Sequence, residues 1–192
     1  MIITFIVVFV IAYIIGSIPT GYLIVKKLKG IDIRKTGSGS TGATNVKRIL
    51  GTKWFFIVLI IDVIKGVIPV YLAYKFANYE DTSDAIGNII FLFGAAPVIA
   101  ALGAVFGHSK SIFLSFTGGK SVATGVGTLL ALSWPVGLAV GAIWALITFF
   151  TKYVSLGSII AVSLAPIIMT AIYPNVYYIC YAALCAIYVI IK

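Results

Sequence analysis

The sequence WFFIVLIIDVIKGVIPVYLAY, residues 54–74, carries only two charged side chains, Asp62 and Lys65. The hydrocarbon core of a bilayer takes about 20 apolar residues per helical crossing, so this stretch predicts a transmembrane helix. The whole chain has the same character, since 61% of its 192 residues are hydrophobic and 10% are charged. A single core of that size cannot bury so much apolar surface. The composition therefore predicts an all-α integral membrane protein and excludes a disordered chain, a disulfide scaffold and a nucleic-acid-binding domain.

Six further apolar stretches bring the prediction to seven crossings in a single polytopic membrane domain, residues 1–192. The predicted spans are about 2–25, 54–74, 86–106, 121–133, 136–150, 159–173 and 176–191. The first should break or kink near Pro19, because proline has no amide hydrogen to donate. The fourth rises only about 20 Å as a helix, less than the roughly 30 Å hydrocarbon core, so it must extend into its flanks or cross only part of the membrane.

The charged residues predict the orientation of these spans. Residues 26–53 hold eight Lys and Arg against Asp32, a balance of +7, whereas residues 75–84 have a balance of −2. Because loops rich in Lys and Arg stay in the cytoplasm, we expect the N-terminus outside and the C-terminus in the cytoplasm. The same basic residues would attract anionic lipid headgroups.

The first glycine loop, residues 37–48 (GSGSTGATNVKR), resembles a phosphate cradle. Glycines allow backbone N–H groups to converge on one point, hydroxyl side chains add donors, and Lys47 and Arg48 add positive charge. Its GxGxxG spacing lacks the strand and helix of a dinucleotide-binding unit, so no nucleotide is expected. The alternative is a flexible linker between spans. The candidate phosphate-site residues here are Gly37, Ser38, Gly39, Ser40, Thr41, Gly42, Thr44, Asn45 and Arg48.

The second glycine loop, residues 117–125 (TGGKSVATG), repeats the pattern. A nucleotide-binding P-loop would need a glycine at position 114, which is Leu114, so that motif is rejected. What remains is a turn of Gly118 and Gly119 that presents Lys120 at the start of a helix, whose N-terminus also favours an anion. Both loops are predicted to be cytoplasmic and re-entrant-like. Together they suggest a substrate with two phosphates, or two phosphorylated substrates.

Three titratable residues outside these loops are further candidates for the site. Asp62 and Lys65 share one helix face at i, i+3, and charges within a span are usually paired or functional, so they form either a structural pair or a support for the site. His108, the one histidine, is either a general base or a structural residue at the membrane interface. Four residues further on lies Ile112, so the His–x₄–Asp device of soluble acyltransferases is absent. No ligand cluster predicts a metal, and no cofactor is expected.

With these motifs in place, the chain resembles the PlsY family, the acyl-phosphate:glycerol-3-phosphate acyltransferases of bacterial membranes. The resemblance rests on Gly16-Ser17 with Gly21 and on residues 37–48, 107–108, 116–124 and 155–158, of which the run GSGxxGATNxxR is the most specific. It implies seven helices in the bacterial inner membrane and an active site that faces the cytoplasm. Ser40 stands where most relatives have Asn, and the family's cytoplasmic His-Arg-x-Asn-Ile tail would follow Lys192.

The resemblance implies a reaction in which a fatty acyl group passes from acyl phosphate to the 1-hydroxyl of glycerol 3-phosphate. The products would be lysophosphatidic acid and phosphate, in the first acylation of bacterial phospholipid synthesis. Because acyl phosphate is already activated, the protein must orient its substrates and stabilise charge. The expected catalytic residues are Ser38, Asn45, Arg48 and Lys120, and the expected further substrate contacts are His108, Ser155 and Ser158.

The family mechanism has the substrate phosphate accept the hydroxyl proton, with the acyl chain between helices and open to lipid. We expect a monomer that takes these two substrates and membrane lipids, with no nucleic acid or nucleotide partner. A rival interpretation is a transporter for a phosphorylated solute, which the broken helices and the echo between residues 42–44 and 122–124 would suit. A non-catalytic membrane scaffold would leave both glycine loops unexplained.

Overall fold

The structure is a computed structural model that describes residues 2–77 and 94–191. In these ranges all regular structure is helical, apart from one isolated bridge between Ser111 and Thr117. The α-helices are α1 (Ile2–Ser17), α2 (Thr20–Lys29), α3 (Ala43–Leu50), α4 (Thr52–Ala77), α6 (Ala96–Ser109), α7 (Val122–Leu132), α8 (Trp134–Thr151), α9 (Val154–Ile172) and α10 (Val176–Ile191). Two 3₁₀ turns, η1 (Ile33–Lys35) and η3 (Ile112–Leu114), lie in the connections.

The helices have the lengths and surfaces of an integral membrane protein. Four segments are long and apolar enough to cross a bilayer: Ile2–Lys29, Thr52–Lys75, Trp134–Thr151 and Val154–Ile172. Helices α6, α7 and α10 are apolar but shorter. Large apolar side chains such as Ile60, Leu138 and Phe149 point outward, which suits a surface bathed in lipid. The first part of the predicted third span, 86–93, lies outside the described residues.

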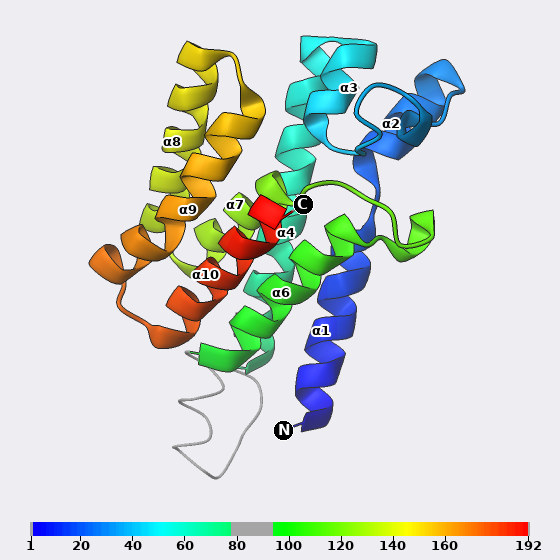
Figure 1. Ribbon diagram of the computed structural model, residues 1–192. Coiled ribbons are helices and arrows are strands. Elements are labelled where there is room, and N and C mark those ends of the chain that lie inside the picture. Colours follow the sequence, from blue (N-terminus) through cyan, green and yellow to red (C-terminus); the bar gives the residue numbers. More distant parts are fainter. Residues whose placement is uncertain (1, 78–93, 192) are drawn as a thin grey trace.

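Different segments of the chain form the two ends of the helix bundle. Figure 1 shows the N-terminus, the start of α6 and the α9–α10 turn at one end, with α2, α3 and the α8–α9 turn at the other. Helix α6 packs along α1, α7 packs along α4, and α9 packs between α8 and α10. The basic segments of the sequence thus lie together at the end opposite the N-terminus.

Glycines allow the closest helix pairs. A Cβ at Gly16 would overlap the Ala104 backbone where α1 meets α6, and a Cβ at Gly127 would overlap the Val63 carbonyl where α7 meets α4. Lipid-embedded helices gain little from the hydrophobic effect on associating, so small residues that bring backbones together supply much of the attraction. The contact of Gly127 with Val63 fixes the register of α4 against α7, and with it the position of Asp62 along the axis of the bundle.

The predicted break near Pro19 is confirmed. Helix α1 ends at Ser17 and α2 begins at Thr20. The Ile18 carbonyl at the break accepts hydrogen bonds from the Thr20 N–H at 3.0 Å and from Lys65 Nζ at 2.9 Å. Backbone carbonyls at membrane depth need such partners, so Lys65 stabilises the break.

Two predicted boundaries were wrong. Helix α9 begins at Val154 rather than at 159, and α8 begins at Trp134 rather than after Pro135. Ser158 lies inside α9, where the helical geometry lets its hydroxyl donate to the Val154 carbonyl at 2.8 Å. Pro135 lies in the first turn of α8, where its missing N–H removes no hydrogen bond.

The α4–α7 contact gives a testable prediction. Gly127→Ala should lower the midpoint of thermal unfolding in detergent, because overpacking a close contact typically costs about 1–3 kcal/mol. The matched control is Gly125→Ala on the same helix, where an added Cβ meets nothing within 4 Å. Equal unfolding midpoints for the two variants, followed by tryptophan fluorescence, would contradict the close packing.

Candidate active site

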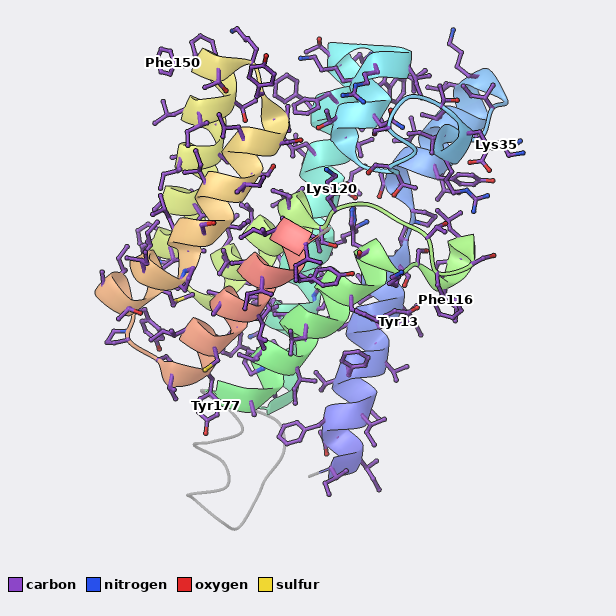
Figure 2. All side chains as sticks on the ribbon, in the orientation of Figure 1. Tyr13, Lys35, Phe116, Lys120, Phe150 and Tyr177 are labelled. Carbon is purple, nitrogen blue, oxygen red and sulfur yellow. The ribbon has the colours of Figure 1, made fainter. Side chains whose placement is uncertain are left out.

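One cavity of about 390 Å³ collects most of the predicted site residues. It lies between the first glycine loop, α4, the start of α7, the α8–α9 pair and the end of α10. The predicted residues that line it are Ser38, Ser40, Gly42, Thr44, Asn45, Arg48, Asp62, His108, Lys120, Ser155 and Ser158. Figure 2 shows Lys120 where the α6–α7 connection enters α7.

Three helices start at this cavity. Residues 42–44 at the start of α3, 121–123 at the start of α7 and 154–155 at the start of α9 all line it. None of the three starts has a side-chain hydrogen bond that caps it. The first N–H groups of each helix therefore remain for a ligand, and each helix dipole places partial positive charge at the wall of the cavity. Such an arrangement binds anions.

Two cations complete this anion site. The Arg48 and Lys120 side chains are exposed and line the cavity, and neither forms an ion pair with a residue in the described ranges. Arg48 offers a planar fork that suits two phosphate oxygens, while Lys120 offers a mobile point charge. Such a combination of cations and helix N-termini suits phosphate groups.

Asn45 lines the cavity, and its side chain also makes several hydrogen bonds to its own loop. Its side-chain amide donates to the carbonyls of Thr36 and Ser40, both at 2.9 Å, and of Ile33 at 3.3 Å, while its Oδ1 accepts from the Ser38 N–H at 3.2 Å. The side chain is 1% exposed. These bonds occupy both donors and the acceptor oxygen. The amide thus shapes the first glycine loop and is not directed at a substrate oxyanion.

Five other predicted residues support the loops without lining the cavity: Gly37, Gly39, Thr41, Gly118 and Gly119. Gly37 and Gly39 turn the chain with φ of +62° and +70°, values that favour glycine. Thr41 is buried against Gly21 of α2, and a Cβ at Gly118 would overlap the His108 carbonyl. The loops turn at these positions so that their neighbours face the cavity.

A buried polar group lies at the α4 wall. Asp62 Oδ1 lies 2.8 Å from Lys65 Nζ and 3.8 Å from His108 Nδ1, and all three side chains are nearly inaccessible to solvent. A Cβ at Gly119 would overlap Nε2 on the other side of the same ring. His108 is therefore held between Asp62 and the second glycine loop. Asp62 and His108 line the cavity, whereas Lys65 points to Ile18.

The two predicted serines of α9 differ in their environment. The Ser158 hydroxyl donates to the Val154 carbonyl and accepts from Trp144 Nε1 at 3.2 Å, so it orients the indole. Ser155 is exposed and lines the cavity one turn nearer the helix start. Of the two, Ser155 is the one placed to contact a ligand.

Part of the cavity wall is apolar, and none of its residues was predicted from the sequence. Leu59 and Val63 of α4, Trp144 of α8, Ile159 of α9 and Val189 of α10 all line the cavity. In an apolar chain nothing in local sequence separates these side chains from those that face lipid. The lining is consequently amphipathic, because it combines cationic and polar side chains with apolar ones.

The two glycine loops are joined by Arg34, which the sequence analysis also missed. Its guanidinium forms a salt bridge with Asp32, with 2.7 Å between Nη2 and Oδ2. The Nη1 group donates a hydrogen bond to the Leu114 carbonyl at 3.3 Å. The guanidinium carbon also lies 5.4 Å from the centre of the Tyr22 ring. The hydrogen bond from Arg34 lowers the pKa of Asp32 from 3.8 to about 2. The sequence does show Asp32 and Arg34 as an opposite-charge pair at i, i+2. That spacing does not reveal that Arg34 also bonds to Leu114, 80 residues further on.

These features define a class before any comparison: a membrane-embedded site for a phosphorylated, amphipathic reactant. The model of the family described as glycerol-3-phosphate acyltransferase matches residues 6–192. The chain belongs to this family and is an acyltransferase.

Named relatives agree. A glycerol-3-phosphate acyltransferase of Trichormus variabilis is 44% identical over 186 residues, 95% of this chain and 82% of the relative. One of Gloeobacter violaceus is 46% identical over 157 residues, 81% of this chain and 71% of the relative. A crystal structure of PlsY (YgiH), an integral membrane glycerol 3-phosphate acyltransferase, in its glycerol 3-phosphate form, matches with a TM-score of 0.85 and 34% identity, over 98% of this chain and 87% of that one. Its lysophosphatidic acid form gives a TM-score of 0.82.

The Asn45 bonds predict a local effect on backbone dynamics. Asn45→Ala should increase amide hydrogen exchange in residues 33–42, because a buried side chain that holds three carbonyls is lost. Lys47→Ala on the exposed face of the same helix is the control and should leave exchange unchanged. Unaltered protection of residues 33–42 in Asn45→Ala would show that the loop keeps its shape without the amide.

The Arg34–Asp32 pair predicts a pH effect. Because the pKa of Asp32 is lowered in the folded chain, the pair stabilises the fold above about pH 4 and loses this effect as pH falls toward 2. Asp32→Asn should therefore lower the unfolding midpoint at pH 6, and the difference from wild type should shrink below pH 4. A difference that persists unchanged at pH 2.5 would contradict this linkage.

Proposed function

We propose that the chain transfers a fatty acyl group from acyl phosphate to the 1-hydroxyl of glycerol 3-phosphate, releasing lysophosphatidic acid and phosphate. The observation that carries this proposal is the amphipathic lining of the cavity, to which Arg48, Lys120, three helix N-termini and apolar side chains such as Leu59 and Trp144 contribute. Acyl phosphate and lysophosphatidic acid each join a phosphate to an acyl chain, so each matches both parts of this lining. The PlsY structures in glycerol 3-phosphate and lysophosphatidic acid forms support the assignment.

The proposed topology has seven crossings in the bacterial inner membrane. Helices α1 and α2 together make the first, and α4, α6, α7, α8, α9 and α10 make the others, with the N-terminus outside. Support comes from the basic residues of 26–53, which lie with the glycine loops at the end away from the N-terminus (Figure 1). The cavity then opens toward the cytoplasm and the C-terminus is cytoplasmic.

The proposed chemistry is a direct displacement. The 1-hydroxyl oxygen attacks the acyl carbon, the bond from that carbon to the phosphate oxygen breaks, and inorganic phosphate leaves with the electron pair. Ser38, Arg48 and Lys120 hold phosphate oxygens and offset the charge that develops on them. Asn45 acts as a positioning residue for Ser38, since its Oδ1 accepts from the Ser38 N–H.

The substrate phosphate is the proposed acceptor of the hydroxyl proton. Arg48 and Lys120 would bring this phosphate to the cavity, where it lies next to the reacting group. His108 has less freedom for this role, because its two ring nitrogens face Asp62 and Gly119. In this proposal a monomer carries out the reaction. It uses the two substrates alone, with no nucleotide or other cofactor.

The acyl chain is proposed to lie along Leu59, Val63 and Ile159, beside the Trp144 indole. A transporter for a phosphorylated solute is less well supported, because an apolar wall has no use in carrying a small polar solute and the family consists of acyltransferases. A scaffold would not need uncapped helix starts around a cavity.

One assay separates enzyme from transporter. The purified chain in detergent is given long-chain acyl phosphate and glycerol 3-phosphate, and phosphate release is followed together with lysophosphatidic acid formation. Release that requires both substrates supports the proposal. Uptake of glycerol 3-phosphate into reconstituted vesicles, with no release of phosphate, would support the transporter instead.

Lys120 gives the sharpest kinetic prediction. Lys120→Ala should lower kcat by about 10²–10³-fold, the range seen when a donor to transition-state charge is removed. Lys110→Ala in the same α6–α7 connection is the matched control, because Lys110 lies outside the cavity lining. Wild-type turnover in Lys120→Ala would reject the phosphate contact.

A further inference from the structure

Asp62 is a carboxylate in the wall of a cavity that otherwise suits anions. It is the one acidic side chain among the residues that line the cavity, and it is 2% exposed. A bare carboxylate there would repel phosphate, since charges attract or repel strongly where water is excluded. Its presence next to an anion site therefore calls for an explanation beyond packing.

Lys65 removes the electrostatic objection. Its Nζ lies 2.8 Å from Asp62 Oδ1, so the pair as a whole is neutral. The ammonium is turned away from the cavity, because it also donates to the Ile18 carbonyl. The cavity therefore meets the carboxylate side of a neutral pair. A carboxylate bound in this way still accepts hydrogen bonds but contributes little net repulsion.

We infer that Asp62 is the residue that recognises the C2 hydroxyl of glycerol 3-phosphate. This inference rests on the proposed function. The acceptor substrate has three polar groups: a phosphate, the reacting C1 hydroxyl and the C2 hydroxyl between them. Arg48, Lys120 and the helix starts together hold the phosphates of both substrates, and the C1 hydroxyl must point at the acyl donor. The C2 hydroxyl then needs a hydrogen-bond acceptor of its own in the buried part of the cavity.

Asp62 suits this task because an ionised carboxylate only accepts hydrogen bonds. The close approach of Gly127 to Val63 and the hydrogen bond of Lys65 to Ile18 hold Asp62 at one height and orientation. A fixed acceptor in a dry site rejects an analogue that lacks the hydroxyl, since its own hydrogen bond is then left unmade.

The test compares glycerol 3-phosphate with propane-1,3-diol monophosphate, which keeps the C1 hydroxyl and the phosphate but lacks the C2 hydroxyl. Wild-type kcat/KM should favour glycerol 3-phosphate by roughly 10–100-fold, the range expected for one hydrogen bond to a charged group. The double variant Asp62→Leu/Lys65→Met removes the acceptor and both charges without leaving either charge unpaired. It should reduce this preference to within about threefold, mainly through loss of activity on glycerol 3-phosphate.

A control separates recognition from loosening of the fold. Tyr181→Phe removes a buried hydrogen bond to Thr128, and Tyr181 does not line this cavity. It should lower the unfolding midpoint while leaving the preference unchanged. The inference is overturned if the double variant keeps the wild-type preference, or if Tyr181→Phe lowers the preference as much.

Direct binding keeps the outcome independent of catalysis and of variant folding. Calorimetric titration of wild-type protein with each of the two phosphates should show the same preference in Kd. Wild type that forms lysophosphatidic acid but binds both phosphates equally would overturn the role of Asp62 alone. Wild type that binds glycerol 3-phosphate selectively but forms no lysophosphatidic acid would overturn the proposed reaction and leave the role of Asp62 standing.

Discussion

The satisfaction of backbone polar groups inside an apolar bundle is the constraint on which this structure depends. A chain with so little polar surface must pair almost every N–H and C=O at membrane depth. It meets this demand at the Ile18 break with Lys65, and at the end of α1 with Ser111, whose hydroxyl donates to the Ser17 carbonyl at 2.6 Å. The starts of α3, α7 and α9, which have no side-chain cap, line the cavity, where water or a ligand can accept from their N–H groups.

The parts of the site are held by side chains that bond to distant carbonyls. Asn45 holds three carbonyls of the first glycine loop, Arg34 reaches Leu114, and Tyr13 donates to the Lys110 carbonyl at 2.7 Å. Each such bond contributes about 1 kcal/mol net, but a buried group left without its partner costs more. Their value lies in geometry, because Arg48 and Lys120 are 72 positions apart in the sequence and line the same cavity.

Features that depend on local sequence could be predicted, and features that depend on distant contacts could not. The composition predicted the membrane class, the glycine loops predicted a phosphate site, and the i, i+3 spacing predicted that Asp62 and Lys65 share a face. The bonds of Asn45 were not predictable, because an Asn behind a glycine loop has the same sequence whether it faces a ligand or its own loop. The start of α9 was misplaced because Ser155 and Ser158 are typical of a turn, and the apolar wall carries no sequence signal at all.

In the Asp62–Lys65 pair, stability explains the presence of Lys65 but not the position of Asp62. Apolar side chains of similar volume often replace a buried ion pair at no loss of stability. Here such a replacement would leave the Ile18 carbonyl without Lys65, so the ammonium has a structural reason to be present. Lys65 in turn needs a counter-charge, which a carboxylate on any packed helix face could supply. Only the choice of position 62 places that carboxylate in the wall of the cavity, beside His108, and this choice is the part that the fold does not require.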